Sequence, residues 1–108
     1  MAFKSQATPN IGVEASPSAV TPTIAVGQTG TVIGLSIANT TAANITISAV
    51  LNKNGGSSAY IVKDATVLSG GTIVIVGGDQ KVVLEEGDSI TAYCSAVNSA
   101  DAVISYLI

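Results

Sequence analysis

The sequence contains no histidine, no arginine and no tryptophan, and it has a single cysteine and a single phenylalanine among 108 residues. Histidine is the usual general base, the most frequent metal ligand and the common partner of a serine or cysteine nucleophile. Its absence excludes the most widespread hydrolytic and metal-dependent sites. Cys94 has neither a histidine nor an arginine to activate it. We therefore expect that the protein is not an enzyme.

Charged side chains are also scarce. They make up 10% of the chain, against roughly 25% in a typical soluble domain. The basic residues are four separated lysines, at positions 4, 53, 63 and 81, and the net charge is −3. Proteins that bind nucleic acids or anionic membranes need clustered basic side chains, so we expect neither partner. A surface so poor in charge is suited to being covered by protein, which favours a homo-oligomer or an assembly component.

Long apolar runs and paired cysteines are absent too. No stretch reaches the roughly 18 consecutive apolar residues that span a bilayer, and the segment MAFKSQATPN lacks the apolar core of a secretion signal. We therefore expect synthesis in a cytoplasm. Cys94 cannot form an internal disulfide by itself, and its alternation with Ile90 and Ala92 indicates a position in the core.

The carboxylates offer one metal hypothesis. Glu85, Glu86 and Asp88 lie close together, one turn after Asp79, and calcium prefers such oxygen ligands. The order E-E-G-D fits no EF-hand loop, and a solvated turn in which Asp88 bonds to nearby backbone is the favoured interpretation. We expect no metal and no cofactor. A paired-carboxylate glycosidase is not expected either, because its sugar cleft is usually lined by aromatic residues.

Residues 1–26 differ from the rest of the chain because they hold all three prolines and many Ser, Thr and Ala residues. The pattern predicts an extended N-terminal arm, with one possible edge strand over residues 11–14. Two interpretations stay open: a disordered tail, or an arm that becomes ordered on a neighbouring subunit. In either case we expect residues 27–108 to fold without residues 1–24.

Residues 27–108 show short β-branched runs separated by Gly, Asn and Asp clusters. This spacing predicts an all-β fold, an antiparallel β-sandwich of about eight strands, with either an immunoglobulin-like or a jelly-roll strand order. In the first strand, Ile33, Leu35 and Ile37 are expected to face the core. The expected strands span residues 31–38, 44–52, 58–62, 65–68, 72–76, 81–84, 89–93 and 102–108.

Two parts of the β region resemble a known family. They are the run YIVKDATVLSGGT from Tyr60 and the run VGGDQKVVLEEGDSI from Val76, whose pattern K-x-x-L-x-x-G-D-x-I begins at Lys81. These runs resemble small β-sandwich structural proteins from the virions of tailed bacteriophages, and residues 32–47 fit the first hairpin of that family. The resemblance covers residues 27–108. It implies a virion protein made in the cytoplasm of a bacterial host.

Within that family the resemblance suggests a capsid decoration or cement protein. Such a protein binds the major capsid protein on the outer shell, commonly as a trimer, and stabilises it through non-covalent contacts. The alternatives are a neck, tail or fibre subunit of the virion and, in a different class, a carbohydrate- or receptor-binding module that uses Tyr60 and Tyr93.

The last strand is apolar on both faces, so one of them could be an interface. The residues expected to contact a partner come from the arm and from this strand. They are Ser5, Pro9, Ile11, Pro17, Pro22, Tyr106 and Ile108.

Overall fold

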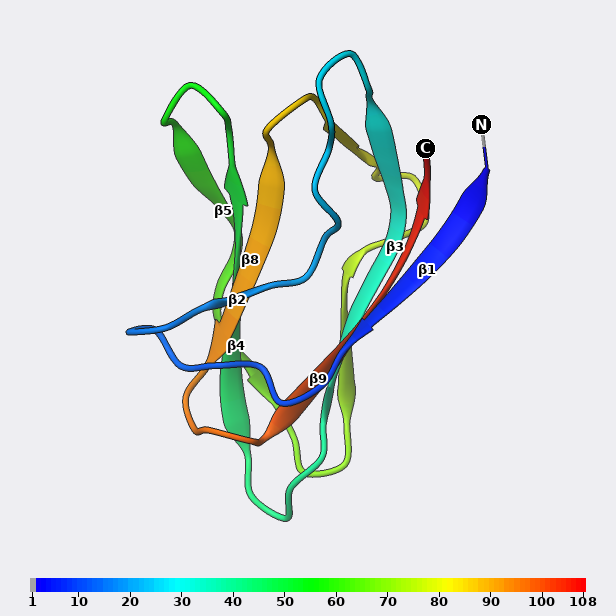
Figure 1. Ribbon diagram of the computed structural model, residues 1–108. Coiled ribbons are helices and arrows are strands. Elements are labelled where there is room, and N and C mark those ends of the chain that lie inside the picture. Colours follow the sequence, from blue (N-terminus) through cyan, green and yellow to red (C-terminus); the bar gives the residue numbers. More distant parts are fainter. Residues whose placement is uncertain (1) are drawn as a thin grey trace.

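The computed structural model describes residues 2–108 as two antiparallel β-sheets packed face to face, with no helix in that range (Figure 1). The all-β prediction is confirmed. The nine strands in these residues are β1 (Phe3–Thr8), β2 (Ser18–Ala19), β3 (Gly30–Asn39), β4 (Ile45–Asn52), β5 (Ser58–Val67), β6 (Thr72–Val76), β7 (Val82–Leu84), β8 (Ser89–Cys94) and β9 (Ala100–Leu107).

Sheet A has the strand order β1-β9-β3-β6, and β7 pairs with β3 beyond the end of β6. Sheet B has the order β2-β8-β4-β5. Most neighbours within a sheet are therefore distant in sequence, and the two chain ends lie side by side because β1 pairs with β9 (Figure 1). Such a fold is held by long-range contacts, so strand pairing and the core between the sheets have to form together.

The core lies between the sheets and is built from aliphatic side chains of both inner faces. In β4 the alternation predicts that Ile45, Ile47, Ala49 and Leu51 face the core; the first three are buried and Leu51 is half-buried. Ser48, on the opposite side of the strand, is also buried. Cys94 is buried as well, and this prediction is confirmed. Within residues 2–108, no helix is long and apolar enough to span a bilayer.

The inward face of β3 differs in part from the prediction. Leu35 and Ile37 are buried, but Val32 is buried in place of Ile33, which is only half-buried. The cause is a register shift between Val32 and Gly34 in the pairing with β9. A β-bulge inserts one residue, so the side chains before and after it alternate with opposite phase.

A second bulge joins two expected strands into one. Residues 58–62 and 65–68 were expected as separate strands, but β5 continues from Ser58 to Val67. Its register against β4 shifts so that Lys63 and Asp64 lie opposite the single residue Ser48. Asp64 has a φ of 50° there, a conformation that Asp adopts more readily than most residues.

The turns of the region 69–88 lie where the Gly and Asp clusters predict them. Gly70, Gly78 and Gly87 each have a positive φ between two strands. The left-handed conformation costs glycine little because it has no Cβ atom. These three positions explain why the short strands β6, β7 and β8 begin and end as expected.

The expected N-terminal arm is not confirmed. β1 adds a strand to sheet A, and β2 adds one to sheet B after the chain crosses between them (Figure 1). Ile11, Val20 and Ile24 are buried in the same core as the later strands. Residues 11–14 are not a strand, although the Ile11 N–H donates to the Ala100 carbonyl. The apolar side chains between the prolines anchor this segment on its own subunit; Met1 lies outside the described residues.

Candidate functional site

The outward side of sheet A carries exposed apolar side chains from four strands: Phe3 of β1, Val103 of β9, Val74 of β6 and Val83 of β7. Cross-strand partners form three rows on it: Phe3–Leu107–Thr31–Val83, Ser5–Ser105–Gly34 and Ala7–Val103–Ser36–Val74. We call these eleven residues the sheet A face. Phe3 is 76% exposed and Val74 is 68% exposed. None of these residues is charged, so the face presents only apolar, hydroxyl and backbone groups.

Charged residues border this face: Asp101 lies two positions before Val103, and the exposed Lys81 lies two positions before Val83. Asp101 pairs with Ala38, which in turn pairs with Thr72 in the next row. Its Oδ1 accepts a hydrogen bond from the backbone N–H of Asn10 at 2.9 Å. The carboxylate is thus engaged by the loop after β1 at the margin of the face.

The outward side of sheet B has a different chemistry. Its cross-strand residues are mainly hydroxyl and amide side chains, with two tyrosines and the charged pair at the bulge. They are Thr46, Ser48, Val50, Asn52, Ser58, Tyr60, Lys63, Asp64, Thr66, Ser89, Thr91 and Tyr93. We call these residues the sheet B face.

The two tyrosines singled out in the sequence come together on the sheet B face. The Tyr60 and Tyr93 hydroxyls are 2.9 Å apart, and this hydrogen bond raises the pKa of Tyr60. Tyr60 is 47% exposed, whereas only 8% of Tyr93 is exposed. The Lys63 ammonium lies 4.9 Å from the centroid of the Tyr60 ring, within the range of a cation–π contact. Coulombic attraction by Asp64, foremost, raises the pKa of Lys63.

A hollow of about 580 Å³ opens beside this tyrosine pair. Its walls come from the loop between β1 and β2, from β4, from the bulge of β5 and from the end of β8. The lining residues are Val13, Glu14, Ala15, Thr46, Asp64, Tyr93, Cys94 and Ser95. Its volume is within the range of small-molecule sites.

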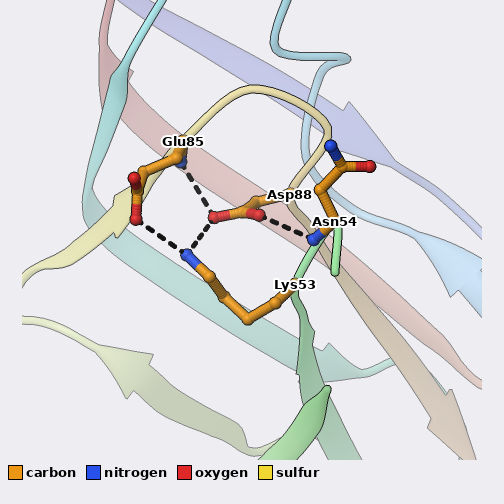
Figure 2. Close-up of polar contacts among 4 residues, drawn as sticks. All are labelled: Lys53, Asn54, Glu85 and Asp88. Atoms are coloured by element: carbon orange, nitrogen blue, oxygen red, sulfur yellow. Dashed lines mark hydrogen bonds and ion pairs between the residues drawn. The ribbon is translucent and has the colours of Figure 1, made fainter. Parts of the chain in front are cut away.

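The acidic turn after β7 has a structural role (Figure 2). The Asp88 side chain is buried and accepts hydrogen bonds from the backbone N–H groups of Glu85 and Asn54, at 2.9 and 3.0 Å, and from the Lys53 ammonium. Lys53 also pairs with Glu85 at 3.1 Å. Asp88 thereby ties the β4–β5 loop to the β7–β8 turn.

These contacts shift both pKa values. The pKa of Asp88 is lowered from its ordinary 3.8, mainly by the hydrogen bond from Lys53. The pKa of Lys53 is raised from 10.5, mainly by the same bond. The expectation that Asp88 bonds to the backbone of its own turn is confirmed, but the expectation of a solvated turn is wrong at Asp88, because this side chain is buried. Among residues 2–108, no three His, Cys, Asp or Glu side chains are arranged so that they could hold a metal ion.

The residues expected to contact a partner are not gathered at one place. Ser5 is exposed on the sheet A face, Pro9 and Pro17 are exposed in or before the loop that leads to β2, and Pro22 and Ile108 are half-buried. The predicted contact with a partner is corrected for Ile11 and Tyr106, because both side chains are buried in the core of their own subunit. The contact of the other five residues with a partner stays a prediction.

Sequence reasoning missed most of the sheet A face. On β9 it chose Tyr106 and Ile108, yet Val103 and Ser105 are the exposed residues. The sequence showed that the odd positions Val103, Ser105 and Leu107 are mostly apolar, but so are the even positions Ile104, Tyr106 and Ile108. Which face is outward depends on the pairing, and the pairing was not readable from β9 alone.

Comparison of the chain with protein-family models, with curated proteins and with solved structures found no match in any of the three.

Proposed function

We propose that the protein is a structural subunit of a tailed-phage virion, a capsid decoration or cement protein that acts through binding and without catalysis. Its partner is the major capsid protein, and it is a homo-oligomer, with a trimer favoured. The family proposal rests on the resemblance of residues 27–108. The observation that carries the docking role is the uncharged sheet A face.

The composition of the sheet A face supports docking onto protein. Phe3, Val74, Val83 and Val103 are more than half exposed in the isolated chain. Burying apolar surface contributes roughly 25 cal/mol per Å² before the costs of association. A face without charges loses no ion hydration when it is covered. We therefore propose that its partner is a flat, uncharged area of a shell subunit.

The size of the face supports a docking contact that includes further residues. A patch of three to four strands, spaced by about 4.8 Å and roughly five residues long, covers about 300 Å² in projection. A stable interface takes about 800 Å² from each partner. Contacts between copies, or with exposed loop residues such as Pro9 and Pro17, would supply the remainder. This deficit favours an oligomer on the shell over a single isolated subunit.

The strand order supports a jelly-roll type of sandwich, which we propose as the finer fold class. If β6 and β7 are counted as one interrupted strand, sheets A and B have four strands each, and successive strands alternate between the sheets except for β4 and β5. This is the arrangement of two interlocked Greek keys. Jelly rolls occur in viral capsid domains and in lectin domains. The fold alone therefore supports either role only by analogy.

The experiment that tests the proposal is quantitative mass spectrometry of purified virions. The proposed role requires a copy number comparable to that of the major capsid protein. A copy number far below it would overturn the cement role and move the protein to the neck, tail or fibres. Complete absence from the particle would overturn the virion proposal.

A further inference from the structure

The hollow on sheet B is lined by polar side chains that are not needed to hold its strands together. It is bordered by two carboxylates from separate segments, Glu14 and Asp64, and by two hydroxyl side chains, Thr46 and Ser95. Tyr93 contributes the aromatic part of the lining, and Val13 and Ala15 contribute apolar atoms. Carboxylates, hydroxyl groups and an aromatic ring around one open volume are the groups that bind a polyhydroxylated ligand.

The backbone fixes one carboxylate at the rim. Asp64 occupies the bulge of β5 at a φ of 50°, and its N–H donates to the Ser48 hydroxyl at 2.9 Å. The same hydroxyl, which is buried, donates to Asp64 Oδ1 at 3.3 Å. A non-glycine residue held in this region of φ is uncommon and is found preferentially at functional sites. The arrangement holds the Asp64 carboxylate on the side of the hollow while leaving its side chain 60% exposed.

The second carboxylate and the hydroxyl groups come from ordered loops. Glu14 lies in a turn closed by the Ser16 N–H donating to the Val13 carbonyl at 2.9 Å. The Ser95 hydroxyl accepts the Thr46 N–H at 3.0 Å, which fixes its oxygen beside the hollow and leaves its proton free to rotate toward a ligand. The Asp64 carboxylate and the Ser95 oxygen are therefore held in place before a ligand binds, and Glu14 is placed there by its backbone turn.

We propose that this hollow binds a saccharide that carries no acidic group. Each carboxylate can accept charge-assisted hydrogen bonds from neighbouring sugar hydroxyls. The apolar atoms of Val13 and Ala15 would lie against the C–H surface of the sugar, and Tyr93, which is only 8% exposed, would add the small part of its side chain that reaches the hollow. Glu14 and Asp64 outnumber the nearby cation Lys63, so the local field disfavours sugars with carboxylate or sulfate groups.

This inference does not depend on the proposed docking role. It concerns the opposite face of the sandwich, and it can be measured on the isolated chain. A virion protein docked through the sheet A face would present the hollow to the solvent. Failure of the copy-number experiment would leave the saccharide site standing, and failure of saccharide binding would leave the docking role standing.

The test is a titration of the ¹⁵N-labelled protein followed by two-dimensional NMR, with maltotriose and chitotriose as neutral probes and sialyllactose as an acidic probe. We expect at least one neutral probe to bind with millimolar affinity, because an open hollow orders a small ligand with few contacts. The amide signals of Asp64, Tyr93 and Ser95 should shift most. The acidic probe should bind more weakly.

Two variants and a control locate the site. Asp64→Asn keeps a side chain that tolerates positive φ, and Glu14→Gln keeps the length of an exposed side chain, so both should fold. Each should weaken binding about tenfold, since each removes charge-assisted hydrogen bonds. Asp79→Asn, in the turn between β6 and β7, should leave the affinity unchanged. Lack of binding by both neutral probes, shifts confined to residues outside the hollow, or unchanged affinity of both variants would overturn the proposal.

Discussion

The two outer faces of the sandwich are built by the same alternation of side chains and differ in what they expose. The sheet A face has valine, leucine, phenylalanine, serine and glycine in its rows, without a charge. The sheet B face has hydroxyl groups, an asparagine, two tyrosines and the Lys63–Asp64 pair. The sheet B face is compatible with permanent contact with water. The sheet A face is more stable when covered, and this asymmetry is the main argument for a docked subunit.

The faces differ in geometry as well as composition. On sheet B, the bulge at Lys63 and Asp64 combines with the loop between β1 and β2 to make a hollow. On sheet A, the rows of paired residues run across β1, β9 and β3 toward β6 and β7. A hollow is suited to a small ligand, and rows of uncharged apolar and hydroxyl side chains are suited to contact with a protein surface.

The largest effect on stability is expected from removing residues 1–24, which connect sheet A to sheet B. Deletion of residues 1–24 removes β1 from sheet A, β2 from sheet B, and the buried side chains of Ile11, Val20 and Ile24. We expect the remainder not to fold, in contrast to what the sequence alone predicted. Circular dichroism and thermal melting would measure this, with deletion of residues 1–2 as the control. A cooperative melt of the shorter chain near the melting temperature of the full chain would contradict the role of this segment in the core.

Cavities on the two inner faces should have the next largest effect on stability, and the two cavities should cost similar amounts. Leu35→Ala in sheet A and Ile47→Ala in sheet B each remove a fully buried side chain. Each should cost about 2–5 kcal/mol in the free energy of unfolding, measured with urea. Val74→Ala on the sheet A face is the matched control, and it should change stability by less than about 0.5 kcal/mol. Equal costs for Val74 and Leu35 would mean that the assignment of inner and outer faces is wrong.

The Lys53–Asp88 cluster predicts the acid dependence of stability. Asp88 has a folded-state pKa below its ordinary value of 3.8. Its contribution is therefore complete above pH 3.8 and is lost as the pH falls through the lowered folded-state pKa. Asp88→Asn should lower the melting temperature at neutral pH and make it less sensitive to pH below 3.8. Glu86→Gln in the same turn is the control; an unchanged acid profile in Asp88→Asn would refute the role of this carboxylate.

The smallest effect on stability is expected on the sheet A face itself. Val103→Lys places a charge in the last of the three uncharged rows, and Thr66→Lys places one on sheet B. Both should change the unfolding free energy by no more than about 0.5 kcal/mol, because both positions are exposed. Sedimentation with virions should distinguish the two variants. The Val103 variant should lose binding to the particle, and the Thr66 variant should keep it. Equal retention of the two variants would argue against docking through sheet A.

Much of the fold was predictable from local sequence. β-Branched runs and Gly-containing turns located the strands between residues 30 and 107, because each signal depends on a few neighbouring residues. The bulges were not predictable: nothing in V-I-G-L shows that Val32 and Leu35 share the inner face. The N-terminal segment was misjudged because its anchors, Ile11, Val20 and Ile24, are too widely spaced to form a periodic pattern.

The candidate sites were less predictable than the strands. In the sequence Tyr60 and Tyr93 are separate aromatic residues, and only the pairing of β5, β4 and β8 brings their hydroxyls together. Asp88 was identified as a turn residue, but its partner Lys53 is 35 positions away. The sheet A face consists of ordinary valines and serines whose significance comes from their alignment across several strands.

The most direct test of docking through the sheet A face uses introduced cysteines, and it is possible because the chain's single natural thiol is buried. Cys94 is buried, so a cysteine introduced on either face can be labelled selectively with a maleimide. Val74→Cys on the sheet A face and Thr66→Cys on the sheet B face should both react in the free protein. If sheet A docks, Val74→Cys will be protected in purified virions while Thr66→Cys still reacts. Equal labelling of the two positions on the particle would contradict docking through the sheet A face.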